Sequence, residues 1–218
     1  MEAYLDNSAT TRVDAQVQEL MKKLMDVDFG NPSSRHQKGV VAEGYIKEAR
    51  QKIAATLKVD PKELIITSGG TESNNMALIG TALAAKRKGN HIITTAVEHP
   101  SVKATASFLE EQGFRITFLS VDSRGQISLE DLKEALTPDT ILVSIMYVNN
   151  EIGTIQPVEE AAKLVHATVP GAVFHVDAIQ AYGKVMIRPK QQGIDLLSVS
   201  SHKFHGPKGA GFLYCSSK

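Results

Sequence analysis

This 218-residue sequence contains a single cysteine, Cys215, and its positive and negative side chains balance at 24 each. One cysteine cannot form an internal disulfide. The zero net charge argues against nucleic-acid or membrane-surface binding, because such partners attract an excess of positive charge. No apolar run approaches the ~20 residues of a membrane span, and residues 1–6 lack the pattern of a signal peptide. These absences predict a soluble cytoplasmic protein.

Hydrophobic residues make up 42% of the chain, which is enough for a sizeable core. They gather in short, β-branched runs separated by amphipathic helical stretches. The expected strands are 64–67, 91–95, 116–119, 141–148, 173–176, 196–199 and 209–215. Ser128 is placed to cap the last of the expected helices, which are 13–24, 46–57, 76–83 and 129–136. This alternation predicts an α/β fold with a mostly parallel sheet.

Lys203 lies just after an expected strand, among hydroxyl residues and before a Gly-Pro turn. A lysine that forms a Schiff base needs a lowered pKa, which partial burial and cationic neighbours provide. Ser200, Ser201 and His202 can donate hydrogen bonds to a phosphate. The alternative is a surface loop that carries two lysines, Lys203 and Lys208.

The segment 67–75, Thr-Ser-Gly-Gly-Thr-Glu-Ser-Asn-Asn, follows an expected strand and opens a helix. Its glycines permit close backbone approach, and the helix N-terminus favours an anion such as phosphate. The segment lacks the Gly-Lys-Ser/Thr ending of a nucleotide-binding P-loop. The alternative is a capped helix after a tight turn.

Three further polar residues follow expected strands: His99, Asn150 and Asp177. Asp177 can pair with a protonated pyridine nitrogen, His99 can stack on a ring and move protons, and amides near Asn150 can bind a ligand. Each also has a purely structural interpretation, as a helix cap or a turn residue. Because parallel strands end at one edge of a sheet, these side chains are expected to converge on a ligand site.

The same segments resemble cysteine desulfurases, a class V aminotransferase-like group of pyridoxal 5′-phosphate (PLP) enzymes. The resemblance begins at residues 4–11 and extends to the last expected strand, through the motifs 29–34, 67–75, 98–99, 148–153, 175–180 and 200–209. Lys208 in the Gly-Pro-Lys-Gly segment favours the NifS/IscS type over the SufS type, which usually has threonine there. The resemblance implies the large domain of the aspartate aminotransferase-like fold.

The resemblance also implies roles for individual residues. Lys203 holds PLP as a Schiff base and moves protons at the substrate's α-carbon, and His99 stacks on the ring as an acid/base group. Asp177 pairs with the ring nitrogen, Gln180 bonds the phenolic oxygen and Asn150 helps to place the substrate. The implied phosphate contacts are Gly70, Thr71, Ser200 and His202, together with one group from the second subunit of a homodimer.

Family members are nearly twice as long as this chain. We therefore expect residues 1–218 to form a PLP-binding large domain with an N-terminal arm, without the small domain and the loop that carries the nucleophilic cysteine. Cys215, inside an expected strand, is not expected to replace that cysteine. The chain is expected to bind PLP without turnover and to expose an apolar patch.

For the complete enzyme, the resemblance implies that L-cysteine is converted to alanine and an enzyme persulfide. It further implies transfer of the sulfur to an iron–sulfur scaffold or a tRNA-thiolation protein. Two alternatives stay open at this point. The first is another PLP lyase or aminotransferase, such as a selenocysteine lyase, and the second is a non-catalytic PLP-binding half of a split protein.

Overall fold

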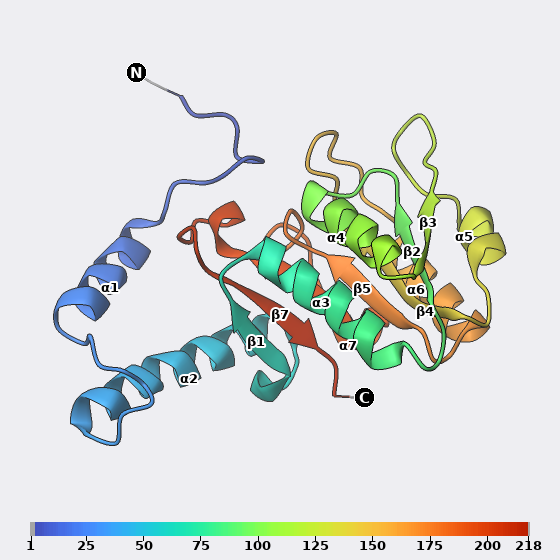
Figure 1. The fold of residues 1–218 in the computed structure, drawn as a ribbon. Helices are drawn as coiled ribbons and strands as arrows, with labels where there is room; N and C mark the ends of the chain where they lie inside the picture. Colours follow the sequence, from blue (N-terminus) through green and yellow to red (C-terminus); the bar gives the residue numbers. More distant parts are fainter. Residues whose placement is uncertain (1–2, 218) are drawn as a thin grey trace.

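The computed structural model describes residues 3–217 and centres on a seven-stranded sheet (Figure 1). The strand order is β1-β7-β6-β5-β4-β2-β3, and among the described strands only β7 runs against the others. The prediction of a mostly parallel sheet is confirmed. The strands are β1 (Leu64–Thr67), β2 (His91–Thr95), β3 (Arg115–Leu119), β4 (Thr140–Met146), β5 (Val173–Asp177), β6 (Leu196–Ser200) and β7 (Gly211–Cys215).

Helices cover both faces of the sheet (Figure 1). On one face, α3 (Gly70–Ala85) packs on the central strands and α4 (Pro100–Glu111) packs beside it. The other face carries α5 (Leu129–Ala135), α6 (Val158–Thr168) and α7 (Pro189–Gln192). No helix among residues 3–217 has both the length and the apolar character needed to cross a membrane.

The sheet separates two hydrophobic cores, because successive strand residues point to opposite faces. In β4, Val143 and Ile145 belong to one core and Leu142 to the other. All seven residues of β4 are buried, as expected for a parallel strand covered on both faces. The β-branched runs thus predicted the strands because they supply apolar side chains to both cores.

Two expected strands were too long. The strand expected over 141–148 ends at Met146, and Val148 makes only an isolated bridge to Ile155. The strand expected over 209–215 begins at Gly211. Gly209 precedes it with φ of 82°, a left-handed conformation that belongs to a turn and that glycine adopts readily. The predicted cap is confirmed: Ser128 Oγ accepts a hydrogen bond from the amide of Asp131.

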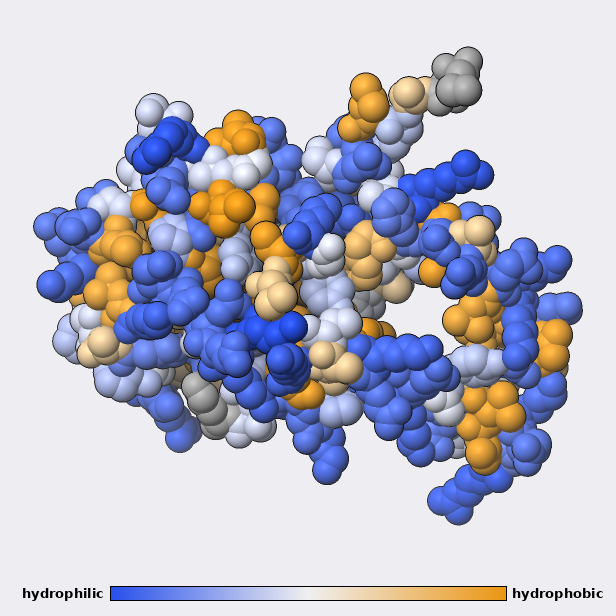
Figure 2. Space-filling model, turned by 180° about the vertical axis from the view of Figure 1, so that it is seen from behind, coloured by the Kyte–Doolittle hydropathy of each residue, from blue (hydrophilic) through white to orange (hydrophobic). Residues whose placement is uncertain are grey.

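An N-terminal arm extends away from the sheet (Figure 1). It contains α1 (Ala15–Asp26), which has no buried residue, and leads into α2 (Gln37–Leu57), which reaches the sheet with its last turns. Apolar side chains are visible on this arm from behind (Figure 2). The large exposed apolar residues of this arm and of α2 are Tyr4, Leu5, Leu20, Met21, Met25, Val27, Phe29, Val40 and Ile46.

Candidate functional site

A cavity of about 540 Å³ lies where β1, β4, β5 and β6 end. Its floor is formed by strand ends and the start of α3, and one wall is formed by the N-terminal arm. Nine of the residues that the sequence singled out line it, so they lie around one cavity. These residues are Gly70, Thr71, His99, Asn150, Asp177, Gln180, Ser200, His202 and Lys203.

Lys203 is half-buried in the short turn that follows β6. Its Nζ donates hydrogen bonds to the backbone oxygens of Ser8, at 2.5 Å, and Ala9, at 2.7 Å. Burial lowers the pKa of the amine, and the charge of Lys184 adds to this effect, whereas Asp6 and Asp177 oppose it. The predicted combination of partial burial and a cationic neighbour is therefore present, and it favours the neutral, nucleophilic amine.

Asp177 ends β5 and is 4% exposed. Its Oδ1 accepts a hydrogen bond from the amide of Ile179 at 3.0 Å, and its Oδ2 accepts one from Asn74 Nδ2 at 2.8 Å. Burial raises the pKa of this carboxyl, while these two donors, together with the charges of His99 and Lys203, act in the opposite direction. The arrangement holds the carboxylate in a fixed orientation at the floor of the cavity.

Asn74 also links Asp177 to His99. Its second Nδ2 hydrogen reaches Ser101 Oγ at 3.0 Å, and Ser101 Oγ lies 2.8 Å from His99 Nδ1. Because His99 Nδ1 also accepts the Ser101 amide as the N-cap of α4, the proton of a neutral His99 belongs on Nε2. The motif 67–75 was predicted to bind an anion, but the role of Asn74 in this network was missed.

The cavity also offers donors for an anion. Gly70 starts α3, and a Cβ on it would lie 2.1 Å from Cδ1 of Ile179, so a larger residue would require the Ile179 side chain to move. Thr71, Ser200 and His202 line the same cavity. Burial, followed by the charge of Lys203, lowers the pKa of His202, which favours a neutral ring that can donate one N–H.

One predicted donor was wrong. Ser201 does not line the cavity, because its hydroxyl is used within its own loop. Ser201 Oγ donates to the backbone oxygens of Pro207 and, at 3.0 Å, Ala210. A Cβ on Gly206 would contact the Ser201 side chain at 2.6 Å. The serine therefore closes the turn that follows Lys203, and a sequence pattern cannot separate this use of a hydroxyl from ligand binding.

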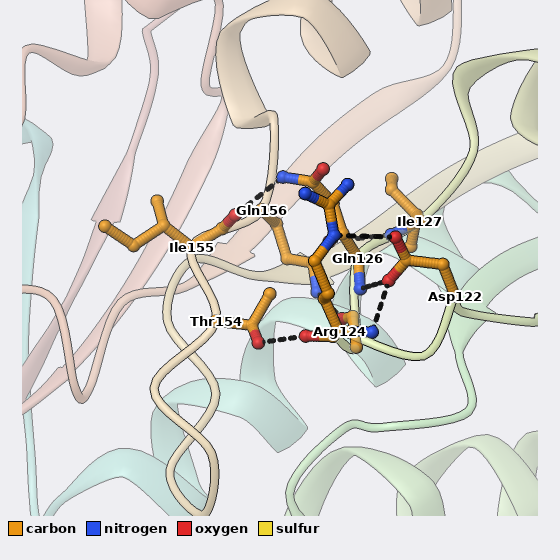
Figure 3. Close-up of polar contacts among 8 residues, drawn as sticks. Asp122, Arg124, Gln126, Ile127, Thr154, Ile155 and Gln156 are labelled. Atoms are coloured by element: carbon orange, nitrogen blue, oxygen red, sulfur yellow. Dashed lines mark hydrogen bonds and ion pairs between the residues drawn. The ribbon is translucent and has the colours of Figure 1, made fainter.

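The loop that carries Asn150 is supported by a second loop, residues 122–127 (Figure 3). Gln156 donates to the backbone oxygen of Gly125 at 2.7 Å and accepts from the amide of Ile127 at 3.0 Å. Thr154 donates to the Arg124 carbonyl next to it. Gln156 is 2% exposed, so its two hydrogen bonds are shielded from water. Asn150 is thus presented by a braced loop.

The arm contributes cavity residues that the sequence did not predict. Gln180 Nε2 donates to the backbone oxygen of Ser8 at 2.8 Å, and Lys203 Nζ donates to the same oxygen. Thr11 Oγ1 donates to the backbone oxygen of His202 at 3.0 Å. The full set of missed lining residues is Asp6, Ser8, Ala9, Ser101, Met146, Val148, Glu151 and Ile179.

Comparison with known proteins gives consistent matches along the whole chain. The sequence profile described as aminotransferase class-V matches residues 3–218. A protein named putative cysteine desulfurase IscS 1, from Bacillus subtilis (strain 168), is 51% identical over 213 residues, which are 98% of this chain and 56% of that protein. Cysteine desulfurase IscS of Dictyoglomus turgidum is also 51% identical, over 98% of this chain and 54% of its own length.

Solved structures agree with these matches. A structure titled NIFS-like protein superposes with a TM-score of 0.97 and 43% identity, over 100% of this chain and 60% of that one. A structure titled SspA in complex with cysteine gives 0.94 and 41% identity, over 98% of this chain and 61% of that one. The chain therefore spans little more than half the length of the relatives that it matches.

Proposed function

Because this chain belongs to the aminotransferase class-V family, we propose that it forms the PLP-binding part of a cysteine desulfurase. The observation that carries the proposal is the cavity itself. Side chains from separate segments of the chain, including Lys203 and Asp177, line this cavity. The chain is also about half identical in sequence to proteins named cysteine desulfurase. The family implies a PLP cofactor.

The donor set fits PLP in its chemistry, because it combines donors for a phosphate with a buried carboxylate and an amide side chain. Gly70, Thr71, Ser200 and His202 would hold the phosphate, aided by the N-terminus of α3. Asp177 would pair with the ring nitrogen, and Gln180 would bond the phenolic oxygen. A volume of about 540 Å³ is within the ordinary range of ligand sites. When bound, PLP supplies an electron sink beside the α-carbon of an amino acid.

The residues around the cofactor would divide the remaining work. The Lys203 amine would hold the aldehyde carbon of PLP and later take the proton from the substrate's α-carbon, for which its lowered pKa is suitable. His99 would stack on the ring and exchange protons through Nε2, because its Nδ1 is occupied by Ser101. Asn150, on its braced loop, would help to orient the substrate.

We propose L-cysteine as the substrate of the complete enzyme, with alanine and a persulfide on an enzyme cysteine as products. The SspA structure, which is titled as a complex with cysteine, supports this substrate. Cys215 is a poor acceptor for the sulfur, because it lies in β7 outside the cavity and burial raises the pKa of its thiol. An iron–sulfur scaffold or a tRNA-thiolation protein would receive the sulfur, and the complete enzyme would be a homodimer in the cytoplasm.

Chemical trapping of PLP tests the proposal. The purified chain is incubated with PLP, reduced with borohydride and digested, and the peptides are mapped by mass. We expect one pyridoxyl group, on Lys203, and its loss in Lys203→Ala. Lys208→Ala is the matched control, since Lys208 is an exposed lysine of the same turn and should not alter labelling. Equal labelling of several exposed lysines, or none of Lys203, would contradict the proposal.

A further inference from the structure

Glu98 is a buried acid, 3% exposed, in the turn between β2 and α4. Its Oε1 accepts hydrogen bonds from Thr95 Oγ1 and from the backbone amide of Met146, both at 2.8 Å. Thr95 ends β2, Met146 ends β4 and lines the cavity, and His99 follows Glu98 directly. One carboxyl oxygen thus ties the turn that carries His99 to the neighbouring strand ends.

The second oxygen of Glu98 is in a different situation. Oε2 is buried and has no hydrogen-bond partner within residues 3–217. A carboxylate oxygen without a hydrogen-bond donor is costly to bury, whereas a protonated carboxyl carries no net charge and still leaves Oε1 free to accept both bonds. The geometry therefore favours the neutral acid.

The charges around Glu98 point the same way. Burial, and next the negative charge of Asp177 on β5, raises the pKa of Glu98 to about 8. Lys103 on α4 opposes this, as do the bonds from Thr95 and Met146. Asp177 receives donors on both oxygens and lies near His99 and Lys203. Of two buried carboxyls, Asp177 is the better placed to carry the charge.

We propose that Glu98 is a positioning residue: as a neutral acid it fixes the His99 turn to the end of β4 and leaves the charge of this buried carboxyl pair on Asp177. This inference rests on the proposed function, because it assigns Asp177 the task of pairing with a cationic ring nitrogen. If Glu98 were also ionised, its negative charge would repel that of Asp177 and make the ionised form of Asp177 less stable.

The dependence of stability on pH tests the charge of Glu98 without any cofactor. Urea unfolding of the PLP-free chain is measured between pH 5 and 8 for the wild type and Glu98→Gln. A folded-state pKa above the unfolded value means that the folded state keeps a proton that the unfolded state releases. The folding equilibrium constant of the wild type should then fall relative to Glu98→Gln by up to about tenfold per pH unit.

Glu63→Gln is the matched control, because Glu63 is also buried but is ionised. Burial alone would raise the pKa of Glu63, yet hydrogen bonds from Lys190 and Ser217 outweigh it and lower the pKa to about 2. Glu63→Gln should therefore change stability by the same factor at every pH from 5 to 8. Parallel curves for wild type and Glu98→Gln, or a Glu98→Gln chain that does not fold, would overturn the proposal.

PLP affinity tests the positioning role. Glu98→Gln keeps the acceptor for Thr95 and Met146, so at pH 7 its dissociation constant should stay within about twofold of wild type. Glu98→Ala removes both bonds, and its affinity should fall about tenfold or more. Equal losses in both variants would contradict the neutral-acid role. Absence of Lys203 labelling in the wild type would instead refute the proposed function, and the pH series would still report on Glu98.

Discussion

The floor and the arm wall of the cavity are built differently. The floor consists of strand ends whose side chains are almost fully buried, such as Asp177 at 4% and Ser200 at 5% exposure. The wall consists of residues 6–9, which are exposed and which reach the cavity through the backbone oxygens of Ser8 and Ala9. The floor is fixed by two hydrophobic cores, whereas the wall is held by hydrogen bonds that water can replace.

Under the proposed function, the buried floor and the exposed wall would have different tasks. The groups that would define the ring and phosphate positions lie on the rigid floor, where small displacements are costly. Lys203 belongs to the floor but donates to the wall, so its amine must leave Ser8 and Ala9 before it can bind an aldehyde. The floor would thus hold the ligand in a fixed position, whereas residues 6–9 could move to release Lys203.

The largest expected contrast concerns stability. Phe174→Ala on β5 removes a ring with no exposed surface from the core beneath the floor and should cost about 3–5 kcal/mol of unfolding free energy. Leu5→Ala on the arm removes a side chain that is 87% exposed and should change stability by less than about 0.5 kcal/mol. Urea unfolding measures both, and equal costs would show that the arm is packed in solution.

A smaller effect is expected within the floor network. Asn74→Ala removes a donor from a buried carboxylate, so about 1.5–3 kcal/mol of unfolding free energy should be lost at pH 7. Ser101→Ala removes only neutral hydrogen bonds and should cost about 0.5–1.5 kcal/mol. Introducing Asp177→Asn should reduce the cost of Asn74→Ala. An unchanged cost in that background would mean that Asn74 acts through packing alone.

The smallest effect is expected for the arm's attachment. Thr11 Oγ1 donates to the backbone oxygen of His202 and accepts from the amide of His205 at 2.7 Å. Thr11→Val keeps the shape and loses both bonds, so the Thr11 amide, which also binds the His202 oxygen, should exchange about tenfold faster. Exchange at Val176 on β5 should not change. Acceleration at both positions would show that the arm and the sheet open together.

The sheet and the floor residues could be predicted from the sequence because both depend on particular types of residue. Apolar β-branched runs marked the strands, and Asp177 and Lys203 stood out as charged residues directly after them. The helical spacing of α1 was equally clear, but it predicted a packed face that the described chain leaves exposed. Periodicity reports which face is apolar and does not report what covers it.

The arm wall and the burial of Glu98 could not be predicted in the same way. Ser8 and Ala9 act through backbone oxygens, which every residue possesses, so no residue type identifies them. Glu98 was noted only as the neighbour of His99. Its protonation depends on the distance to Asp177, 79 positions away in the chain, and on the depth of burial. Such properties arise from tertiary packing.

The position of β7 has a consequence for the order in which the molecule assembles. Within residues 3–217, β1 pairs only with β7, which comes last in chain order among the described strands, so β1 cannot join this sheet until β7 has formed. On a ribosome, residues 64–67 would emerge long before residues 211–215 provide their partner. The start of α3, which follows β1, would therefore reach its final position late, and a nascent chain would become able to bind a ligand only after residues 211–215 have emerged.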